Sequence, residues 1–225
     1  MPDFEPGRRL IDWAQDVDQL ADRLGVGEFY LSGLSAGGPH ALACAHQLPD
    51  RVIAGAVISS VAPMSRPRAY QGMPAPNQLL AGSSSQYPST ARLIRWLMRF
   101  MLTRNPEKAM RRLMSSIPET DKAILYDPGN VEIVMSSIQE GFRQGSRGVA
   151  QDDTLTNRDW GFDLGEVQPR IDIWHGDADV TVPIHAGKHL HNTLPNTRAT
   201  FFPGEGHFLL LSRWEQVLSG LVDGE

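Results

Sequence analysis

The feature that most restricts the fold is a glycine-flanked serine, placed between an apolar run and a segment that favours a helix. Residues 29–31 (FYL) are typical of a short buried strand, and they lead into the sharp turn GLSAG at 33–37. A helix is predicted after this turn, followed by a valine- and isoleucine-rich strand over 53–60. Strand, helix and strand in this order predict a parallel sheet with a right-handed crossover.

The alternation of helices and strands occurs at both ends of the chain and is interrupted in the middle. Apolar residues at spacings of three and four predict an amphipathic helix over 8–24. The later elements are strands over 171–174 and 199–202 and helices over 184–191 and 212–221. The middle is irregular over 65–90 and then helical, centred on 90–103, 106–116, 119–126 and 131–142. We therefore predict an α/β core in two parts, 1–65 and 161–225, separated by a helical lid (cap) at 66–160.

Composition excludes several classes of protein. The 225 residues carry a formal net charge of −5, whereas general nucleic-acid binding requires a basic surface. The single cysteine, Cys44, allows no intrachain disulfide, which suits a reducing compartment. No run of 18 apolar residues is present, and the first residues are polar and acidic, unlike a signal peptide. The sequence thus predicts a cytoplasmic protein with no nucleic-acid partner and no membrane span.

The predicted lid is rich in methionine and arginine. Its methionines indicate either an ordinary helical core or a deformable apolar wall over a binding pocket. Arg92, Arg95 and Arg99 recur on one face of the first lid helix. We interpret this face as solvated, and contact with a membrane surface is the alternative.

The turn at 33–37 matches G-x-S-x-G, the nucleophile elbow. Its strained backbone lifts the Ser35 hydroxyl clear of the sheet, and the small residues two before and two after it let the backbones approach closely. The helix that follows directs free N–H groups toward developing negative charge. We therefore predict Ser35 as the nucleophile and the backbone N–H of Ala36 as one oxyanion donor.

A serine nucleophile requires a base, and the base requires an acid that fixes its tautomer. His207 lies in a glycine-rich turn at 202–208, directly after the last predicted strand, and is the predicted base. Asp177 and Asp179 both follow the strand at 171–174, and spacing alone leaves the choice between these two carboxylates open.

The other histidines are assigned no catalytic role. His40 and His46 lie on the helix after the elbow and are interpreted as structural, and His175 precedes a glycine at a strand end, where packing is expected. The remaining three, interpreted as a solvated helix face, are His185, His189 and His191. A metal site there lacks a nearby cysteine or a paired ligand set. The sequence therefore indicates neither a metal nor another cofactor.

From about residue 7 to its end, the chain resembles the bacterial α/β-hydrolase fold family of the lidded, esterase-like kind. The resemblance is carried by the elbow, by the G-x-x-D-x-x-V-P stretch at 176–183 and by the G-x-G-H stretch at 204–207. The order serine, aspartate, histidine also fits this family. The family places the acid at the last residue of G-x-x-D, which is Asp179. The resemblance thus implies a catalytic triad of Ser35, Asp179 and His207, with Asp177 as a turn residue.

The resemblance also implies a part that the sequence does not contain. The family fold has four strands and a helix before the helix predicted at 8–24, a stretch of roughly 50 residues. That stretch carries a His-Gly turn with the second oxyanion donor, whereas the His-Gly here stands at 175–176. We therefore expect an N-terminally truncated α/β-hydrolase fold, with the strand at 29–31 left as an apolar edge. Such an edge favours pairing with another chain, as in a homo-oligomer.

The leading hypothesis is a serine hydrolase that acts on a small-molecule ester or acyl substrate through an acyl-enzyme intermediate. Amide, carbon–carbon and acyltransfer chemistry remain open, because fold does not define substrate. The alternative hypothesis is a catalytically impaired fragment or pseudoenzyme that binds a ligand or partner, which the missing oxyanion donor favours. A third hypothesis, a membrane-associated lipase, depends only on the arginine-rich lid helix.

Overall fold

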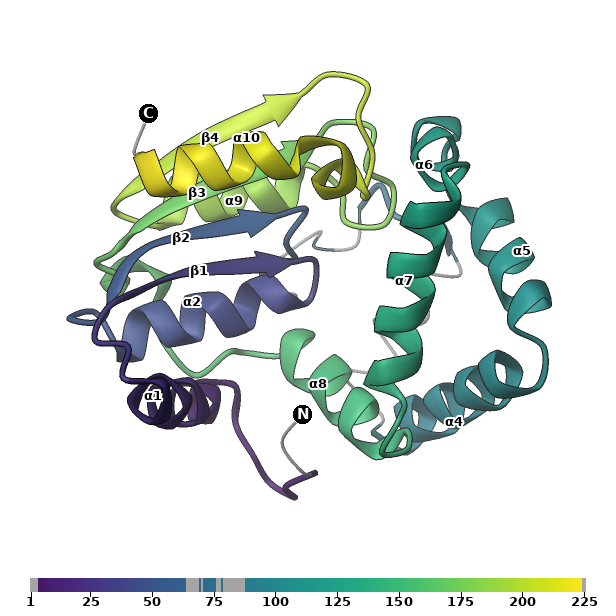
Figure 1. The fold of residues 1–225 in the computed structure, drawn as a ribbon, viewed down its shortest axis with the longest axis horizontal. Coiled ribbons are helices and arrows are strands. Elements are labelled where there is room, and N and C mark those ends of the chain that lie inside the picture. Colours follow the sequence, from purple (N-terminus) through teal and green to yellow (C-terminus); the bar gives the residue numbers. More distant parts are fainter. Residues whose placement is uncertain (1–3, 64–68, 70, 76–77, 79–87, 224–225) are drawn as a thin grey trace.

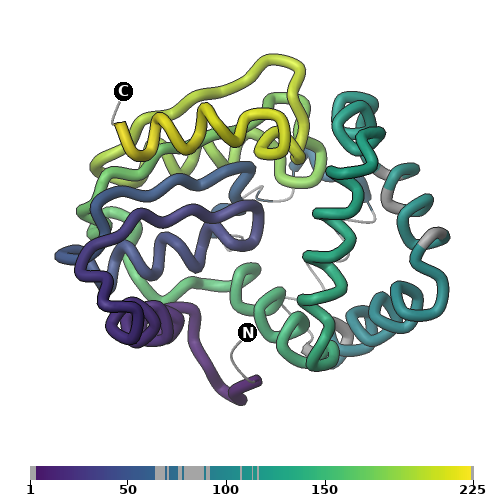
Figure 2. Tube along the Cα trace, in the orientation of Figure 1, coloured from purple at the N-terminus to yellow at the C-terminus, as the bar shows by residue number. Residues whose placement is uncertain are grey.

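A single parallel sheet forms the centre of the protein. The computed structural model describes residues 4–63, 69, 71–75, 78 and 88–223. Within them the sheet has four strands in the order β1-β2-β3-β4, namely β1 (Phe29–Leu34), β2 (Val52–Ile58), β3 (Arg170–Gly176) and β4 (Thr197–Phe202). All three strand pairs are parallel, and the tube in Figure 2 shows the chain crossing over between them. The predicted α/β class with a parallel sheet is confirmed.

Helices cover both faces of this sheet (Figure 1). The core helices are α1 (Trp13–Leu24), α2 (Gly37–Gln47), α9 (His185–Thr193) and α10 (Leu209–Asp223), with short 3-10 turns η1 (Leu10–Asp12) and η2 (Leu164–Glu166). Successive strand residues point to opposite faces. Val57 and Ile173 therefore pack with α2 and α9, whereas their neighbours Ile58 and Trp174 pack with α10.

The chain between β2 and β3 forms a helical insert, by which we mean α4 to α8. Its helices are α4 (Pro88–Arg104), α5 (Pro106–Ser116), α6 (Glu119–Leu125), α7 (Pro128–Gly141) and α8 (Arg147–Thr156). Figure 1 shows the insert beside the carboxyl ends of the strands. Most of the stretch predicted to be irregular, 65–90, lies outside the described residues. Among the described helices, none combines the length and the apolar character needed to cross a membrane.

The fifth insert helix, α8, was not expected from the sequence. The segment contains Gly148 and a polar run at 151–153, so it lacks the apolar periodicity that reveals a helix. In the structure α8 packs against α4 and η1, and Ala150 is buried. This helix is therefore stabilised by tertiary packing and not by a strong helical preference of its own sequence.

The interpretation of the α4 arginines as a solvated face is wrong for two of the three. Arg95 pairs with Asp153 on α8 at 2.7 Å, and the Arg99 Nε–H donates to the Phe142 carbonyl at 3.2 Å. Arg92 is exposed, as expected. The exposed apolar side chains of α4 lie at helical spacing and are Leu93, Trp96, Leu97, Phe100 and Met101. The apolar face of α4 is thus exposed, while Arg95 and Arg99 hold the helix to the rest of the insert.

On the N-terminal side of the core, the expected apolar edge is observed, because β1 pairs with β2 on one side and with no other strand in the described part of the chain. Tyr30, expected in a buried strand, is exposed together with Leu34. In α1 the buried face consists of Ala14 and Ala21, whereas Leu20 is 57% exposed. Periodicity gives the helix itself, but the buried face depends on which neighbours pack against it.

Candidate active site

Ser35 occupies the sharp turn between β1 and α2, as the sequence predicts. Its φ of 55° lies in the left-handed region, which is costly for a residue with a side chain. The Ser35 N–H donates to the Ile58 carbonyl at 2.9 Å, and the Ser35 carbonyl accepts from Gly38 N–H at 3.2 Å. The end of β2 and the first turn of α2 therefore hold the strained backbone in place.

Two glycines around Ser35 permit close backbone packing, but they are not quite the expected pair. A Cβ on Gly33 would lie 2.6 Å from the Gly37 carbonyl oxygen, so this position requires glycine. A Cβ on Gly37 would have no atom within 4 Å, whereas one on Gly38 would lie 1.8 Å from Ser60 Oγ. The second crowded position is therefore Gly38, one residue beyond the motif, where α2 passes the end of β2.

Replacing Gly38 by alanine is expected to destabilise the fold by about 1–3 kcal/mol, the usual cost of overpacking a core. Gly37→Ala is the matched control and should cost less, because its new methyl group meets open space. The double variant Gly38→Ala/Ser60→Gly removes the clashing side chain and should recover part of the loss. Urea unfolding measures all three, and equal stability of the two alanine variants would contradict this packing.

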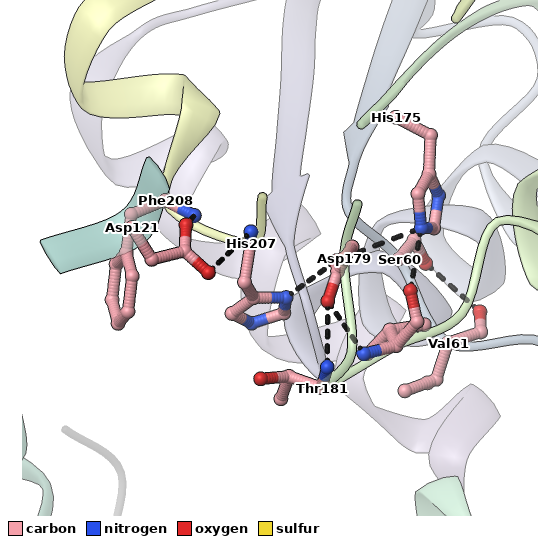
Figure 3. Close-up of polar contacts among 9 residues, drawn as sticks. Ser60, Val61, Asp121, His175, Asp179, Thr181, His207 and Phe208 are labelled. Atoms are coloured by element: carbon pink, nitrogen blue, oxygen red, sulfur yellow. Dashed lines mark hydrogen bonds and ion pairs between the residues drawn. The ribbon is translucent and has the colours of Figure 1, made fainter. Parts of the chain in front are cut away.

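His207 and Asp179 meet directly, although 28 residues separate them along the chain. The His207 Nδ1–H donates to Asp179 Oδ2 at 2.8 Å, and both side chains are buried (Figure 3). The other Asp179 oxygen, Oδ1, accepts from the N–H groups of Thr181 and Val182, each at 2.8 Å. The loop after β3 therefore fixes the carboxylate, and the carboxylate fixes the histidine.

Of the two candidate carboxylates, only Asp179 contacts His207. Asp177 instead turns toward the loop after β4, where its Oδ1 accepts from Gly204 N–H at 2.7 Å. This bond ties the two loops together beyond the ends of β3 and β4. The structure thus brings Asp179 against His207 and places Asp177 in a contact between the two loops.

The pKa of His207 lies above its ordinary value. Burial alone lowers the pKa, but the Asp179 carboxylate, through charge and hydrogen bond, and the nearby Asp121 together outweigh this effect. With Nδ1–H held by Asp179, the lone pair of the neutral ring is at Nε2. That nitrogen is the atom that could accept a proton from a nucleophile.

His175 is buried beside this pair and packs, as expected. Its Nε2–H donates to the Val182 carbonyl at 2.8 Å and lies 3.6 Å from Asp179 Oδ2. Burial lowers the pKa of His175, which favours the neutral ring. A Cβ on Gly187 of α9 would lie 2.7 Å from its Nδ1, so a glycine is needed for the helix to pass.

The structure does not join Ser35 to His207 by a hydrogen bond within the described residues. Ser35 follows β1 and His207 follows β4, three strand spacings away, or roughly 14 Å at the strands themselves. The His207 loop returns across the sheet end toward Asp179, which follows β3. Among the described residues the Ala36 N–H has no hydrogen-bond acceptor. The roles of Ser35 and Ala36 therefore stay predictions.

His40, His185 and His191 form hydrogen bonds away from Asp179 and His207. The solvated face expected on α9 is observed in part, because His191 is exposed whereas His185 and His189 are half-buried. His185 Nε2–H donates to the Gln71 carbonyl at 2.6 Å, and His191 Nδ1 bonds Thr197 Oγ1 at 2.7 Å. On α2, His40 Nδ1–H donates to the Ala36 carbonyl at 3.0 Å. Within the described ranges no three histidine, cysteine, aspartate or glutamate side chains gather as metal ligands would.

Asp121 is the site residue that sequence reasoning missed. It lies on α6 of the insert, is fully buried, and accepts hydrogen bonds from the backbone N–H groups of His207 and Phe208 (Figure 3). In the sequence it is one acidic residue on a short polar helix, which normally indicates a solvated face. The only signal is indirect, because the family-like G-x-G-H stretch contains Gly206, and glycine there leaves room for Asp121.

The sequence model of the alpha/beta hydrolase fold family matches residues 6–213, so the chain belongs to this family. Solved structures of similar fold include an esterase from Thermogutta terrifontis, which is 20% identical with a TM-score of 0.63. That alignment covers 99% of this chain and 74% of the esterase.

Two further solved structures share the fold. An esterase from Rhodococcus sp. ECU1013 is 20% identical, with a TM-score of 0.55, over 97% of this chain and 76% of its own. An alpha/beta hydrolase fold protein from Nakamurella multipartita is 18% identical, with a TM-score of 0.63, over 93% and 75%. The chain thus spans about three quarters of each of these proteins. No curated protein is significantly similar to it in sequence.

Proposed function

We propose that this protein is a serine hydrolase that cleaves carboxylic esters through an acyl-enzyme intermediate. The observation that carries the proposal is the buried Asp179–His207 pair, bonded at 2.8 Å, in a fold whose elbow presents Ser35 with a φ of 55°. A packing histidine needs neither a buried carboxylate partner nor a raised pKa, whereas a general base benefits from both.

In the proposed reaction, Ser35 Oγ attacks the acyl carbon while His207 Nε2 accepts the hydroxyl proton. His207 then donates this proton to the leaving alcohol, and water repeats the sequence to release the acid. Asp179 holds the tautomer and stabilises the imidazolium. The Ala36 N–H, at the start of α2, stabilises the oxyanion. The partial positive charge of the helix N-terminus adds to this stabilisation.

Esters are favoured over other acyl substrates by the solved structures of similar fold. Two of them are esterases, and a third, 18% identical, is described as an N-acyl homoserine lactone degrading enzyme; a lactone is a cyclic ester. We also propose that the helical insert, within the segment 66–160, is a lid that selects the substrate, because it lies beside the strand ends (Figure 1).

Burst kinetics with p-nitrophenyl acetate and butyrate test the proposed function. An acyl-enzyme predicts a fast release of nitrophenol equal to the enzyme concentration, followed by slower steady turnover. The corresponding p-nitroanilides should react far more slowly if esters are the substrates. A folded sample that hydrolyses neither ester would favour the alternative of a ligand-binding protein without catalysis.

The pH dependence of ester hydrolysis should reflect the raised pKa of His207. Only the neutral ring can act as a base, so kcat/KM should rise as pH increases through the pKa of His207. Because the Asp179 and Asp121 carboxylates raise that pKa, the half-maximal point should lie above pH 6.5, the ordinary histidine value. Measurement between about pH 5 and pH 9 checks this. Full activity well below pH 6.5 would contradict the assignment of His207 as the base.

A further inference from the structure

The carboxylate of Asp121 accepts hydrogen bonds from the loop that contains His207. Its Oδ2 accepts from the His207 N–H at 3.0 Å, and its Oδ1 accepts from the Phe208 N–H at 2.9 Å. Both oxygens are thus bonded to adjacent backbone groups from a part of the chain 86 and 87 residues away. Figure 3 shows the carboxylate directed at this backbone, on the opposite side of His207 from Asp179.

These two N–H groups directly precede α10, which begins at Leu209. The first N–H groups of a helix lack partners within the helix, and its N-terminus attracts negative charge. Asp121 supplies a charged acceptor from a different part of the chain, and α6 packs against α10. The start of α10, and with it the backbone of His207, is therefore held by the helical insert.

Gly206 is needed for this contact. A Cβ at position 206 would lie 2.4 Å from Asp121 Cγ and from both of its carboxylate oxygens. Any larger residue would push the carboxylate off the loop. Gly206 and Asp121 therefore pack directly against each other.

Asp121 also contributes charge to the site. The pKa of Asp121 is raised above its ordinary value, chiefly by burial, although the two backbone hydrogen bonds and His207 act in the opposite direction. The groups that face His207 are Asp179 on its Nδ1, Asp121 on its backbone and His175 beyond Asp179. Two carboxylates, one from the core and one from the insert, thus act on the same histidine.

We propose that Asp121 is a positioning residue for His207, which makes the docked helical insert a condition for full activity. This inference rests on the proposed function, in which His207 is the base. In this proposal the insert not only covers the site but also holds the backbone of His207, the proposed base, in place. Movement of α6 away from the loop would release His207 and remove a negative charge near it.

Asp121→Asn tests the proposal, since the amide is of equal size but carries no charge and sets an N–H donor against one of the loop N–H groups. We expect kcat to fall about 10- to 100-fold, the loss of a charged hydrogen bond, with KM changed little. The pKa of His207, followed by NMR titration of its ring, should fall, and the rising limb of kcat/KM should move to lower pH. Glu119→Gln is the matched control, because it removes a charge from the exposed part of the same helix and should change neither.

Gly206→Ala provides a second variant in case Asp121→Asn does not fold. It displaces the carboxylate without removing its charge, and we expect a comparable fall in kcat with α10 still formed. The positioning role is overturned if a folded Asp121→Asn variant keeps the wild-type kcat and His207 pKa. It is also overturned if thermal stability and kcat fall while the His207 pKa and the pH limb stay unchanged, which a purely structural role predicts. If the wild type proves inactive, the proposed function fails, whereas the NMR titration still decides whether Asp121 acts on His207.

Discussion

Replacing Ser35 by alanine is expected to lower kcat for ester hydrolysis by about 10⁴- to 10⁶-fold, the usual loss when a serine nucleophile is removed. The reason is that no other hydroxyl occupies the strained turn from which the acyl carbon is attacked. Binding should persist, because the substituted atom forms its bond to substrate only during the reaction. Steady-state kinetics on p-nitrophenyl butyrate measure the loss, and the burst should disappear with it.

A matched control separates this effect from general damage to the strand. Ser32 lies three residues earlier, on β1, and is exposed. Ser32→Ala should keep kcat within about twofold of the wild type, as expected for a surface change remote from the elbow. A Ser35→Ala variant that retained more than a few per cent of the wild-type kcat would show that another residue carries the reaction.

Replacing Asp179 by asparagine is expected to lower kcat by about 10⁴-fold, through the tautomer of His207 rather than through its position. The N–H groups of Thr181 and Val182 both point at Oδ1, so the amide oxygen of asparagine will occupy that place. Its NH₂ group then faces His207 and donates to Nδ1. The ring is forced to carry its proton on Nε2, where the base must be free.

The neighbouring Asp177 supplies the control for this prediction. Asp177→Asn weakens a bond to the Gly204 N–H but leaves His207 untouched, so kcat should fall by less than about tenfold. The pH limb assigned to His207 should remain in Asp177→Asn and vanish with the activity in Asp179→Asn. A larger loss in the Asp177 variant would contradict this geometry. It would leave open again which of the two aspartates orients His207.

Local patterns predicted the parallel sheet and the location of the elbow. Strand β1, the turn at Ser35 and helix α2 follow from an apolar run, a glycine-rich turn and small helical residues in direct succession. Asp179 and His207 lie in the loops after β3 and β4. These loops are at the same edge of the sheet because the strands are parallel. Such features depend on a few adjacent residues, which is why the sequence alone indicates them.

Features that depend on distant contacts were not predictable in the same way. Asp179, and not Asp177, contacts His207 through a hydrogen bond to a loop 28 residues away, and spacing could not predict that contact. Arg95 and Arg99 were predicted to be solvated because their partners lie far along the chain, Asp153 on α8 and the Phe142 carbonyl directly after α7. Asp121 bonds a backbone 86 residues away, and a backbone N–H leaves no signature in a sequence.

The most direct test of the proposed serine chemistry is covalent labelling with a fluorophosphonate, followed by intact mass and peptide mapping. The probe phosphonylates a serine whose hydroxyl is activated by a neighbouring base. We expect one adduct per chain, located on Ser35, lost in Ser35→Ala and strongly slowed in Asp179→Asn. A folded wild-type sample that takes no label, or takes it on another residue, would contradict the assignment of Ser35 as the nucleophile.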